Sequence, residues 1–223
     1  MAMCTLIATK TEEGVLVGMN RDEFPERMHS EYVNRDLLYP VDPLKKGTWI
    51  GVSKTTGNVA ALLSRVELPS ERTRGEIVPY VLRTGGLPPK LLCYAPFTLF
   101  KYNAALELFY VTTWNRNEVK TYETSNPVVL ASGSDVVVAQ RTQFLAEQAR
   151  QIKTFEDLRA LLRNHELEMP ATVCLHGLFA QTLSSLIMKH DLHDKTIEVY
   201  DLVGNPCKEE YKQVRNISYG KGR

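Results

Sequence analysis

The stretch MCTLIATKTEEGVLVGMNRDEF, residues 3–24, decides how the chain begins to fold. Two short apolar segments, residues 4–8 and 15–19, flank the polar sequence TKTEEG, which suits a hairpin loop. The second segment leads directly into four polar residues, Asn20, Arg21, Asp22 and Glu23. Because a β-hairpin places the start of its first strand beside the end of its second, we expect Cys4 to lie next to this polar group.

The rest of the chain alternates strand-rich and helix-rich regions. Strands are predicted at residues 48–53, 59–64, 97–102, 107–114, 118–123, 128–131, 172–176, 183–189 and 196–202. Helices are predicted at residues 76–82, 138–151 and 155–163, the last with Thr154 as its N-cap. His190 and His193 fall in the polar sequence HDLHDK between the last two strands, where we expect them to be solvated.

Tight turns join most of these strands, and this decides the fold class. Strands joined by tight turns are antiparallel, because parallel strands need long crossover connections. The chain shows no repeat, low-complexity tract or linker, so we predict a single domain over residues 1–223. The class is α+β, with the helices grouped apart from the strands. Two sheets stacked between helical layers would use this many strands, although periodicity alone leaves one sheet possible.

Charge and cysteine content narrow the function classes. The chain has 27 Lys plus Arg against 26 Asp plus Glu, a formal net charge of +1, which predicts no nucleic-acid partner. Its four cysteines form no CxxC pair, and only Cys174 and His176 lie close in sequence. This spacing argues against a zinc site or a disulfide framework and favours a reducing compartment. We find no signal-peptide pattern and no apolar run of about 20 residues, so we expect a cytoplasmic protein without a membrane span.

Further motifs follow the first hairpin in a recognisable order. They are GTWIG at 47–51, VAAL at 59–62, RGEIV at 74–78 and VCLH at 173–176. Together with the MC pair, NRDE, Phe24 and Arg27, they resemble the NRDE family, also called the transport and Golgi organisation 2 family. The resemblance implies an N-terminal-nucleophile hydrolase-like fold, an αββα sandwich of two mostly antiparallel sheets between helical layers. It also implies a role in moving haem between compartments.

A hydrolase of this type needs a thiolate nucleophile, a base and donors that hold the oxyanion. Cys4 is the candidate nucleophile, Asp22 would orient the amine that acts as base, and Asn20 or Arg21 would bind a substrate carbonyl or carboxylate. In the sequence as written, Cys4 follows three residues, so its nitrogen is an amide that cannot act as a base. Removal of those residues would restore the amine.

Three further motifs depart from the family pattern and weaken catalysis. The family's Leu-Thr-Asn after VAA reads Leu62, Leu63 and Ser64 here, and its Leu-Ser-Asn reads Ala131, Ser132 and Gly133. Its Gly-Thr after the VCLH motif reads Ala180 and Gln181. The loss of one oxyanion donor typically lowers the catalytic rate by about 100- to 1000-fold. The loss of two such amides would therefore lower the rate still further.

Binding of a small molecule makes fewer demands. An amphipathic ligand such as haem needs an apolar slot and basic residues, to which Arg21, Glu23, Arg27, Trp49 and His176 could contribute. No cofactor is required for this reading, and no metal site is predicted. A structural alternative also stays open: Cys4 would be a buried strand residue, and NRDE would tie the second strand to the loop after it. A partner-binding module without catalysis is the remaining possibility.

Overall fold

The structure, a computed structural model, describes residues 4–29, 31–133, 135–165, 172–177 and 181–220. Met3 and Ala180, which belong to the sequence motifs, lie outside the described residues. The chain divides into two compact units, one drawn from residues 4–28 and 126–218 and the other from residues 29–125 and 219–220. The single domain over residues 1–223 stays a prediction.

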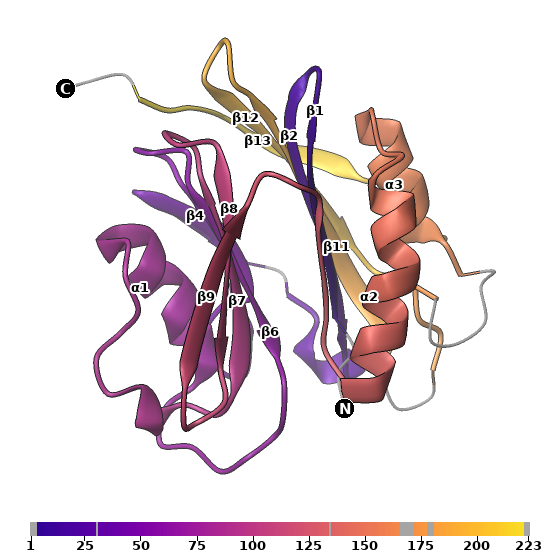
Figure 1. The fold of residues 1–223 in the computed structure, drawn as a ribbon. Helices are drawn as coiled ribbons and strands as arrows, with labels where there is room; N and C mark the ends of the chain where they lie inside the picture. The colour runs from indigo at the N-terminus through magenta and orange to yellow at the C-terminus, as the bar shows by residue number, and fades with distance from the viewer. Residues whose placement is uncertain (1–3, 30, 134, 166–171, 178–180, 221–223) are drawn as a thin grey trace. The chain divides into compact units, whose positions relative to one another are not determined.

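The first unit is a six-stranded antiparallel sheet with two helices (Figure 1). Its strands in sheet order are β10 (Val128–Ala131), β1 (Thr5–Thr11), β2 (Gly14–Glu23), β11 (Gln181–Asp191), β12 (Thr196–Val203) and β13 (Lys212–Ser218). Helix α2 (Asp135–Ala149) packs on β10 and β1, and α3 (Phe155–Arg163) packs on β2 and β11. A short 3-10 helix, η1 (Pro25–Arg27), follows β2.

Helix α3 approaches β2 at a glycine. A Cβ atom on Gly18 would lie 2.7 Å from a methyl carbon of Leu162 and 3.0 Å from one of Leu158, so a larger residue here would force these leucine side chains to shift. Apolar side chains of the sheet and both helices complete the layer, among them Ile7, Leu16 and Leu145. The predicted helix 155–163 is confirmed, and Thr154 caps it with a reciprocal capping box to Asp157.

The second unit is a seven-stranded antiparallel sheet with one α-helix among its described residues. Its strands in sheet order are β3 (Tyr32–Asn34), β4 (Leu37–Pro40), β5 (Ile50–Ser53), β6 (Val59–Ser64), β7 (Phe97–Asn103), β8 (Leu108–Trp114) and β9 (Val119–Thr124). Helix α1 (Ile77–Thr84) packs on β5 and β6, and the short helices η2 (Arg74–Glu76) and η3 (Leu91–Cys93) flank it.

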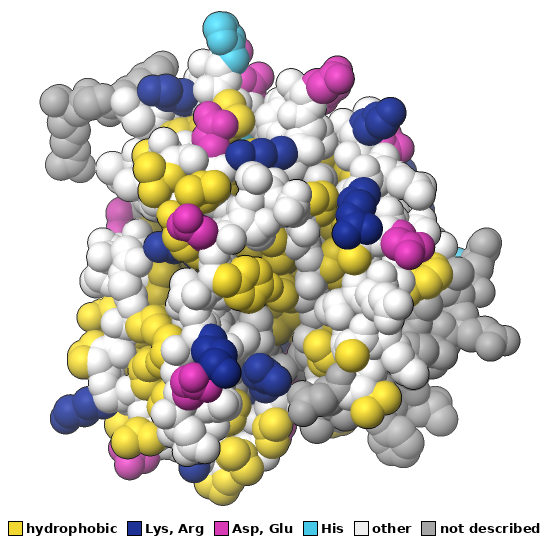
Figure 2. Space-filling view, in the orientation of Figure 1, with side chains coloured by type: hydrophobic (Ala, Val, Ile, Leu, Met, Phe, Trp, Pro, Cys, Tyr) yellow, Lys and Arg dark blue, Asp and Glu magenta, His cyan; other side chains and the backbone are white. Residues whose placement is uncertain are grey.

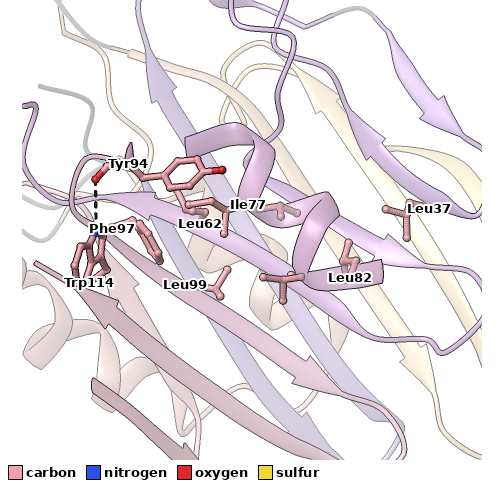
Figure 3. Packing of buried hydrophobic residues seen from close by; sticks show 11 residues of the cluster. Leu37, Leu62, Ile77, Leu82, Tyr94, Phe97, Leu99 and Trp114 are labelled. Carbon is pink, nitrogen blue, oxygen red and sulfur yellow. Dashed lines mark hydrogen bonds between the residues drawn. The ribbon is translucent and has the colours of Figure 1, made fainter. Parts of the chain in front are cut away.

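Figure 3 shows the apolar layer between α1 and this sheet, which includes Leu62, Phe97 and Leu99. Pro79 does not interrupt α1, because it is the third helical residue, where a backbone N–H has no partner within the helix. Gly85 ends the helix in the left-handed conformation, with φ of 80°.

The predicted α+β class with two mostly antiparallel sheets is confirmed, and each sheet has its own helical layer. Several elements differ from the sequence predictions. The first hairpin is tighter than expected, with only Glu12 and Glu13 between the strands. Helix α2 lies at 135–149 rather than 138–151. Strands β3, β4 and β13 were not predicted.

Two local predictions are wrong. Residues 172–176 form no regular strand and make only an isolated bridge, between His176 and Gln181. Their backbone N–H groups turn elsewhere, since those of Val173 and Cys174 both donate to Asn164 O. His190 is buried rather than solvated, because β11 continues through it, and burial lowers its pKa to about 3.

Candidate functional site

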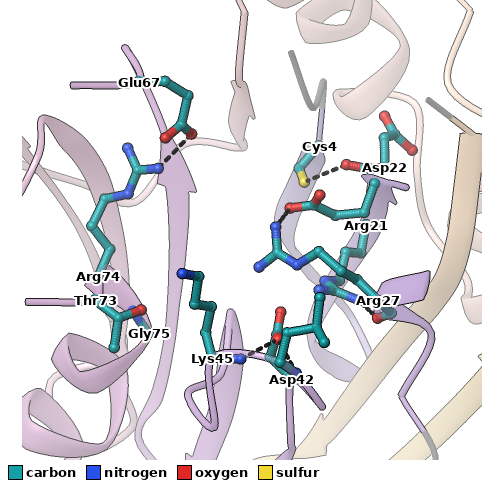
Figure 4. A network of polar contacts seen from close by, with 12 residues as sticks. Cys4, Arg21, Asp22, Arg27, Asp42, Lys45, Glu67, Thr73, Arg74 and Gly75 are labelled. Atoms are coloured by element: carbon teal, nitrogen blue, oxygen red, sulfur yellow. Dashed lines mark hydrogen bonds and ion pairs between the residues drawn. The ribbon is translucent and has the colours of Figure 1, made fainter. Parts of the chain in front are cut away.

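The hairpin places Cys4 beside Asp22, as predicted. Thr5 pairs with Asn20 across β1 and β2, and the Cys4 thiol donates to the backbone oxygen of Asp22 over 3.8 Å (Figure 4). Alternation along the strands separates the side chains, however. Asn20 and Asp22 lie on the sheet face that carries the helices, whereas Cys4 and Arg21 lie on the opposite face. The thiol therefore meets the carbonyl of Asp22 rather than its carboxylate.

The environment of Cys4 keeps the thiol protonated. Burial raises its pKa to about 12, and the neighbouring carboxylates of Asp22 and Glu23 raise it further than Arg21 lowers it. A raised pKa disfavours the thiolate at neutral pH, and the thiolate is the nucleophilic form of cysteine. The described geometry therefore supplies no standing thiolate nucleophile at this position.

Asn20 holds two backbone segments together. Its side-chain amide donates to Leu162 O over 2.8 Å and to Val173 O over 3.1 Å, and the residue has no solvent exposure. Leu162 belongs to the last turn of α3, and Val173 begins the irregular segment before β11. The NH2 group therefore serves the fold in this structure, whereas the Oδ1 atom of the same amide is buried without a hydrogen-bond partner among the described residues.

Asp22 is the centre of a second buried group. Thr182 Oγ1 donates to its carboxylate over 2.6 Å and accepts from Leu175 N over 2.8 Å. The Arg141 guanidinium of α2 donates to Thr172 O and attracts the same carboxylate. Burial outweighs these favourable partners and raises the pKa of Asp22 to about 7.

The remaining NRDE residues tie β2 to η1. Arg21 is 2 % exposed and donates to the backbone oxygen of Arg27, while the Arg27 guanidinium pairs with Glu23. The side chains of Phe24 and Met28, on either side of η1, are 50 % and 41 % exposed. The end of this segment thus presents two apolar side chains and the partly exposed Arg27.

Trp49 belongs to the second unit. It is buried, meets the ring of His29 edge-on at 5.1 Å between centroids, and its backbone oxygen accepts from Leu62 N. Within this unit the GTW and RGE motifs meet: Thr48 N donates to Gly75 O, and a Cβ atom on Gly47 would lie 2.6 Å from Gly75 Cα. Both glycines are needed for this backbone crossing.

Further polar contacts of the second unit lie near its loops and the short helix η2. Asp42 accepts from the N–H groups of Leu44 and Lys45, and Arg74 pairs with Glu67 (Figure 4). Charged side chains of both signs are interspersed over the molecular face drawn in Figure 2, in keeping with the balanced composition. No helix of the described residues is long and apolar enough to cross a membrane.

His176 is exposed and lies in a group that the sequence spacing did not reveal. Its Nε2 atom is 3.0 Å from Cys207 Sγ and 3.8 Å from Cys174 Sγ, and its ring meets that of His165 at 5.3 Å. Cys174 and His176 are the only Cys/His pair close in sequence, and the fold brings Cys207 and His165 to the same group. The predicted role of His176 in ligand binding stays a prediction.

Sequence reasoning missed Arg141, Thr182, Cys207 and His165. Arg141 had a signal: it lies three residues after Val138 and four before Leu145, on the apolar stripe of a predicted helix, where an unpaired charge would be costly. Thr182, Cys207 and His165 had none, since each reaches its neighbours only through the sheet topology.

These observations define an α+β protein whose first hairpin carries a buried cysteine against an NRDE segment. The model of one family, described as Transport and Golgi organisation 2, matches residues 3–203. The chain therefore belongs to the transport and Golgi organisation 2 family. A search of curated proteins found no match.

Proposed function

We propose that this chain binds and transfers a small amphipathic anion, with haem as the leading candidate, and does not cleave amides with Cys4. The observation that carries the proposal is the contrast at the end of β2. Cys4 is buried with a raised pKa, and Asn20 and Asp22 bind protein groups, whereas Phe24 and Met28 are exposed around Arg27. Ligand binding needs the residues that remain exposed around Arg27. Catalysis would need Cys4, Asn20 and Asp22, which are buried.

Haem suits the exposed residues in its charge and its apolar surface. Apolar side chains can cover a porphyrin face, and a guanidinium can hold a propionate by paired hydrogen bonds. Arg27 has 29 % side-chain exposure beside Glu23, which leaves it reachable by a ligand carboxylate. Arg21, the residue that the sequence favoured as the anion contact, is buried and donates to Arg27 O. Its truncation would therefore lower the stability of the fold before it reported on ligand binding. We assign no axial ligand.

A titration of ferric haem into the purified chain tests the proposal. We expect the absorbance of the Soret band to show saturable one-to-one binding of haem. Arg27→Gln should weaken binding by about tenfold, the equivalent of one charge-assisted hydrogen bond. Phe24→Ser should weaken it by about the same factor, because apolar contact with the ligand is lost. Arg83→Gln, which removes an exposed arginine of α1 paired with Asp36, is the matched control and should leave binding unchanged. His176→Ala asks whether the imidazole takes part. Absence of binding by folded wild type would remove haem.

The alternative is an N-terminal-nucleophile cysteine amidohydrolase, and it has its own test. Panels of acyl amides and acyl-homoserine lactones are offered to the full chain and to a variant that begins at Cys4. We expect no turnover that depends on Cys4. Turnover abolished by Cys4→Ser would instead establish the hydrolase, and failure of both assays would favour a non-catalytic interaction module.

We also propose a cytoplasmic or otherwise reducing location for the protein. All four cysteines are free thiols: Cys4, Cys93, Cys174 and Cys207. Free thiols persist where glutathione and thioredoxin keep them reduced. Fractionation of cells that express the full protein tests this proposal.

A further inference from the structure

We propose that Cys174, His176, Cys207 and His165 bind one zinc ion. One ligand atom each from His165, His176 and Cys207 lies within 4.8 Å of the others. Cys174 Sγ lies 3.8 Å from His176 Nε2 and also interacts with the thiol of Cys207. In a tetrahedral zinc site, neighbouring ligand atoms are separated by about 3.6 Å, so small side-chain adjustments complete the site.

Three separate segments supply these ligands, and contacts within the first unit hold two of them. His165 lies two residues after the end of α3. Cys174 and His176 belong to the segment that Asn20 and Thr182 hold through Val173 and Leu175. Cys207 lies on the turn after β12, where Lys208 N donates to Asn205 O. A site whose ligands are held in advance loses less entropy when the metal binds.

The turn that carries Cys207 is fastened to α3. Glu210 accepts from Arg159 over 3.1 Å and from Arg163 over 3.0 Å, and Tyr211 donates to Ser185 Oγ over 2.5 Å. Because His165 follows Arg163 by two residues, these contacts set the separation between two of the proposed ligands. The group is therefore held by contacts beyond the four side chains themselves.

The chemistry of the donors suits zinc. Two thiolates and two imidazoles match the soft and borderline ligands of structural zinc sites, and two thiolates balance the charge of the ion. His165 Nδ1 lies 3.3 Å from Arg163 O, so this nitrogen donates and leaves Nε2 as the ligand atom. Binding releases one proton from each thiol to solvent.

The site does not need a thiolate before the ion arrives, because a bound divalent cation ionises the thiols that coordinate it. His165 and His176 are exposed, so an ion can enter from solvent.

The test uses the full chain, reduced with a phosphine and stripped with a chelator. Cobalt(II) is titrated as a spectroscopic probe, followed by zinc. We expect one equivalent of cobalt to give the d–d bands of a tetrahedral site and a thiolate charge-transfer band, both removed by zinc. Cys207→Ser and His176→Gln should each weaken binding by about 100-fold. Calorimetry with zinc measures the same affinities.

The controls keep folding and non-specific binding apart from the proposal. Cys93→Ser removes a partly buried cysteine of the second unit, and His193→Gln removes an exposed histidine. Both should bind cobalt as wild type does, and circular dichroism should show that every variant is folded. The proposal is overturned if reduced, folded wild type gives no tetrahedral cobalt spectrum, or if Cys93→Ser weakens binding as much as Cys207→Ser.

Discussion

Two polar groups of the first unit differ in what their side chains contact. Asn20 and Asp22 are fully buried, and each binds a backbone or side-chain partner of known position. His176 and Cys207 are exposed or partly exposed, and their donor atoms converge on one another. The buried group makes its hydrogen bonds to the fold through Asn20 Nδ2 and Asp22 Oδ1, whereas the exposed group has donor atoms that a ligand can reach from solvent.

The first group also positions the second. Asn20 holds Val173 O, and the Asp22–Thr182 pair holds Leu175 N, on either side of Cys174. The family's NRDE residues thus shape the segment that carries the VCLH motif. Conservative changes in the buried group should therefore affect stability first and metal binding second, and changes in the exposed group should do the reverse.

The largest expected effect comes from Asn20→Ala. This change leaves Leu162 O and Val173 O buried without their donor, and each unsatisfied carbonyl costs about 1–3 kcal/mol. We expect the free energy of unfolding to fall by about 3–5 kcal/mol, measured by urea denaturation. Asn216→Ala, at an exposed position of β13 in the same sheet, should change it by less than about 0.5 kcal/mol. Equal losses would show that the buried amide is not what holds these segments.

A smaller effect, with a diagnostic pH dependence, is expected for Asp22→Asn. The folded-state pKa of Asp22, about 7, lies above its ordinary value of 3.8. The folded state therefore binds the proton more tightly, and this contribution to stability is full below about pH 4 and lost as the pH rises through about 7. Relative to the variant, wild type should lose about 2–4 kcal/mol over this range, measured by urea denaturation at several pH values.

Asp157→Asn is the matched control for that profile. The pKa of Asp157 is lowered, mainly because its carboxylate accepts from the N–H groups of Lys153 and Thr154. Its contribution is present above the ordinary pKa and is lost as the pH falls, so the sign is opposite. A flat difference between wild type and Asp22→Asn would show that the Asp22 carboxylate is ionised in the fold throughout.

The contrast also explains which features the sequence could reveal. The β1–β2 hairpin and α3 follow from local signals, the apolar alternation around TKTEEG and the Thr154 cap. The juxtaposition of Cys4 with the NRDE segment followed from the hairpin alone. The separation of Cys4 and Asp22 onto opposite faces also follows from alternation once the strand is known to reach Glu23.

The Cys/His group could not be found in this way. His176 and Cys207 are 31 residues apart, and they meet because β11 and β12 pair from Ser184 opposite Val203. No local pattern encodes that register. The segment 172–176 was misassigned for a related reason: its β-forming composition suits a strand, but side-chain oxygens and the end of α3 capture its N–H groups. His190 shows the reverse error, since polar neighbours in sequence concealed an inward-facing strand position.

The smallest expected effect comes from Glu210→Gln, which removes the charge that joins the Cys207 turn to α3. Glu210 is well exposed and pairs with Arg159 and Arg163, and exposed pairs of this kind contribute little to folding. We expect the midpoint of thermal unfolding to change by no more than about 2 °C. Cobalt affinity should nevertheless fall by about two- to fivefold, because a looser turn loses more entropy when Cys207 is immobilised on the metal.

Glu156→Gln is the matched control, since Glu156 pairs with the same Arg159 but does not contact the turn. If both variants bind cobalt as wild type does, the salt bridges do not help to place Cys207. If Glu210→Gln instead lowers the unfolding midpoint as strongly as Asn20→Ala, the distinction between a group that holds the fold and a group that binds a ligand fails.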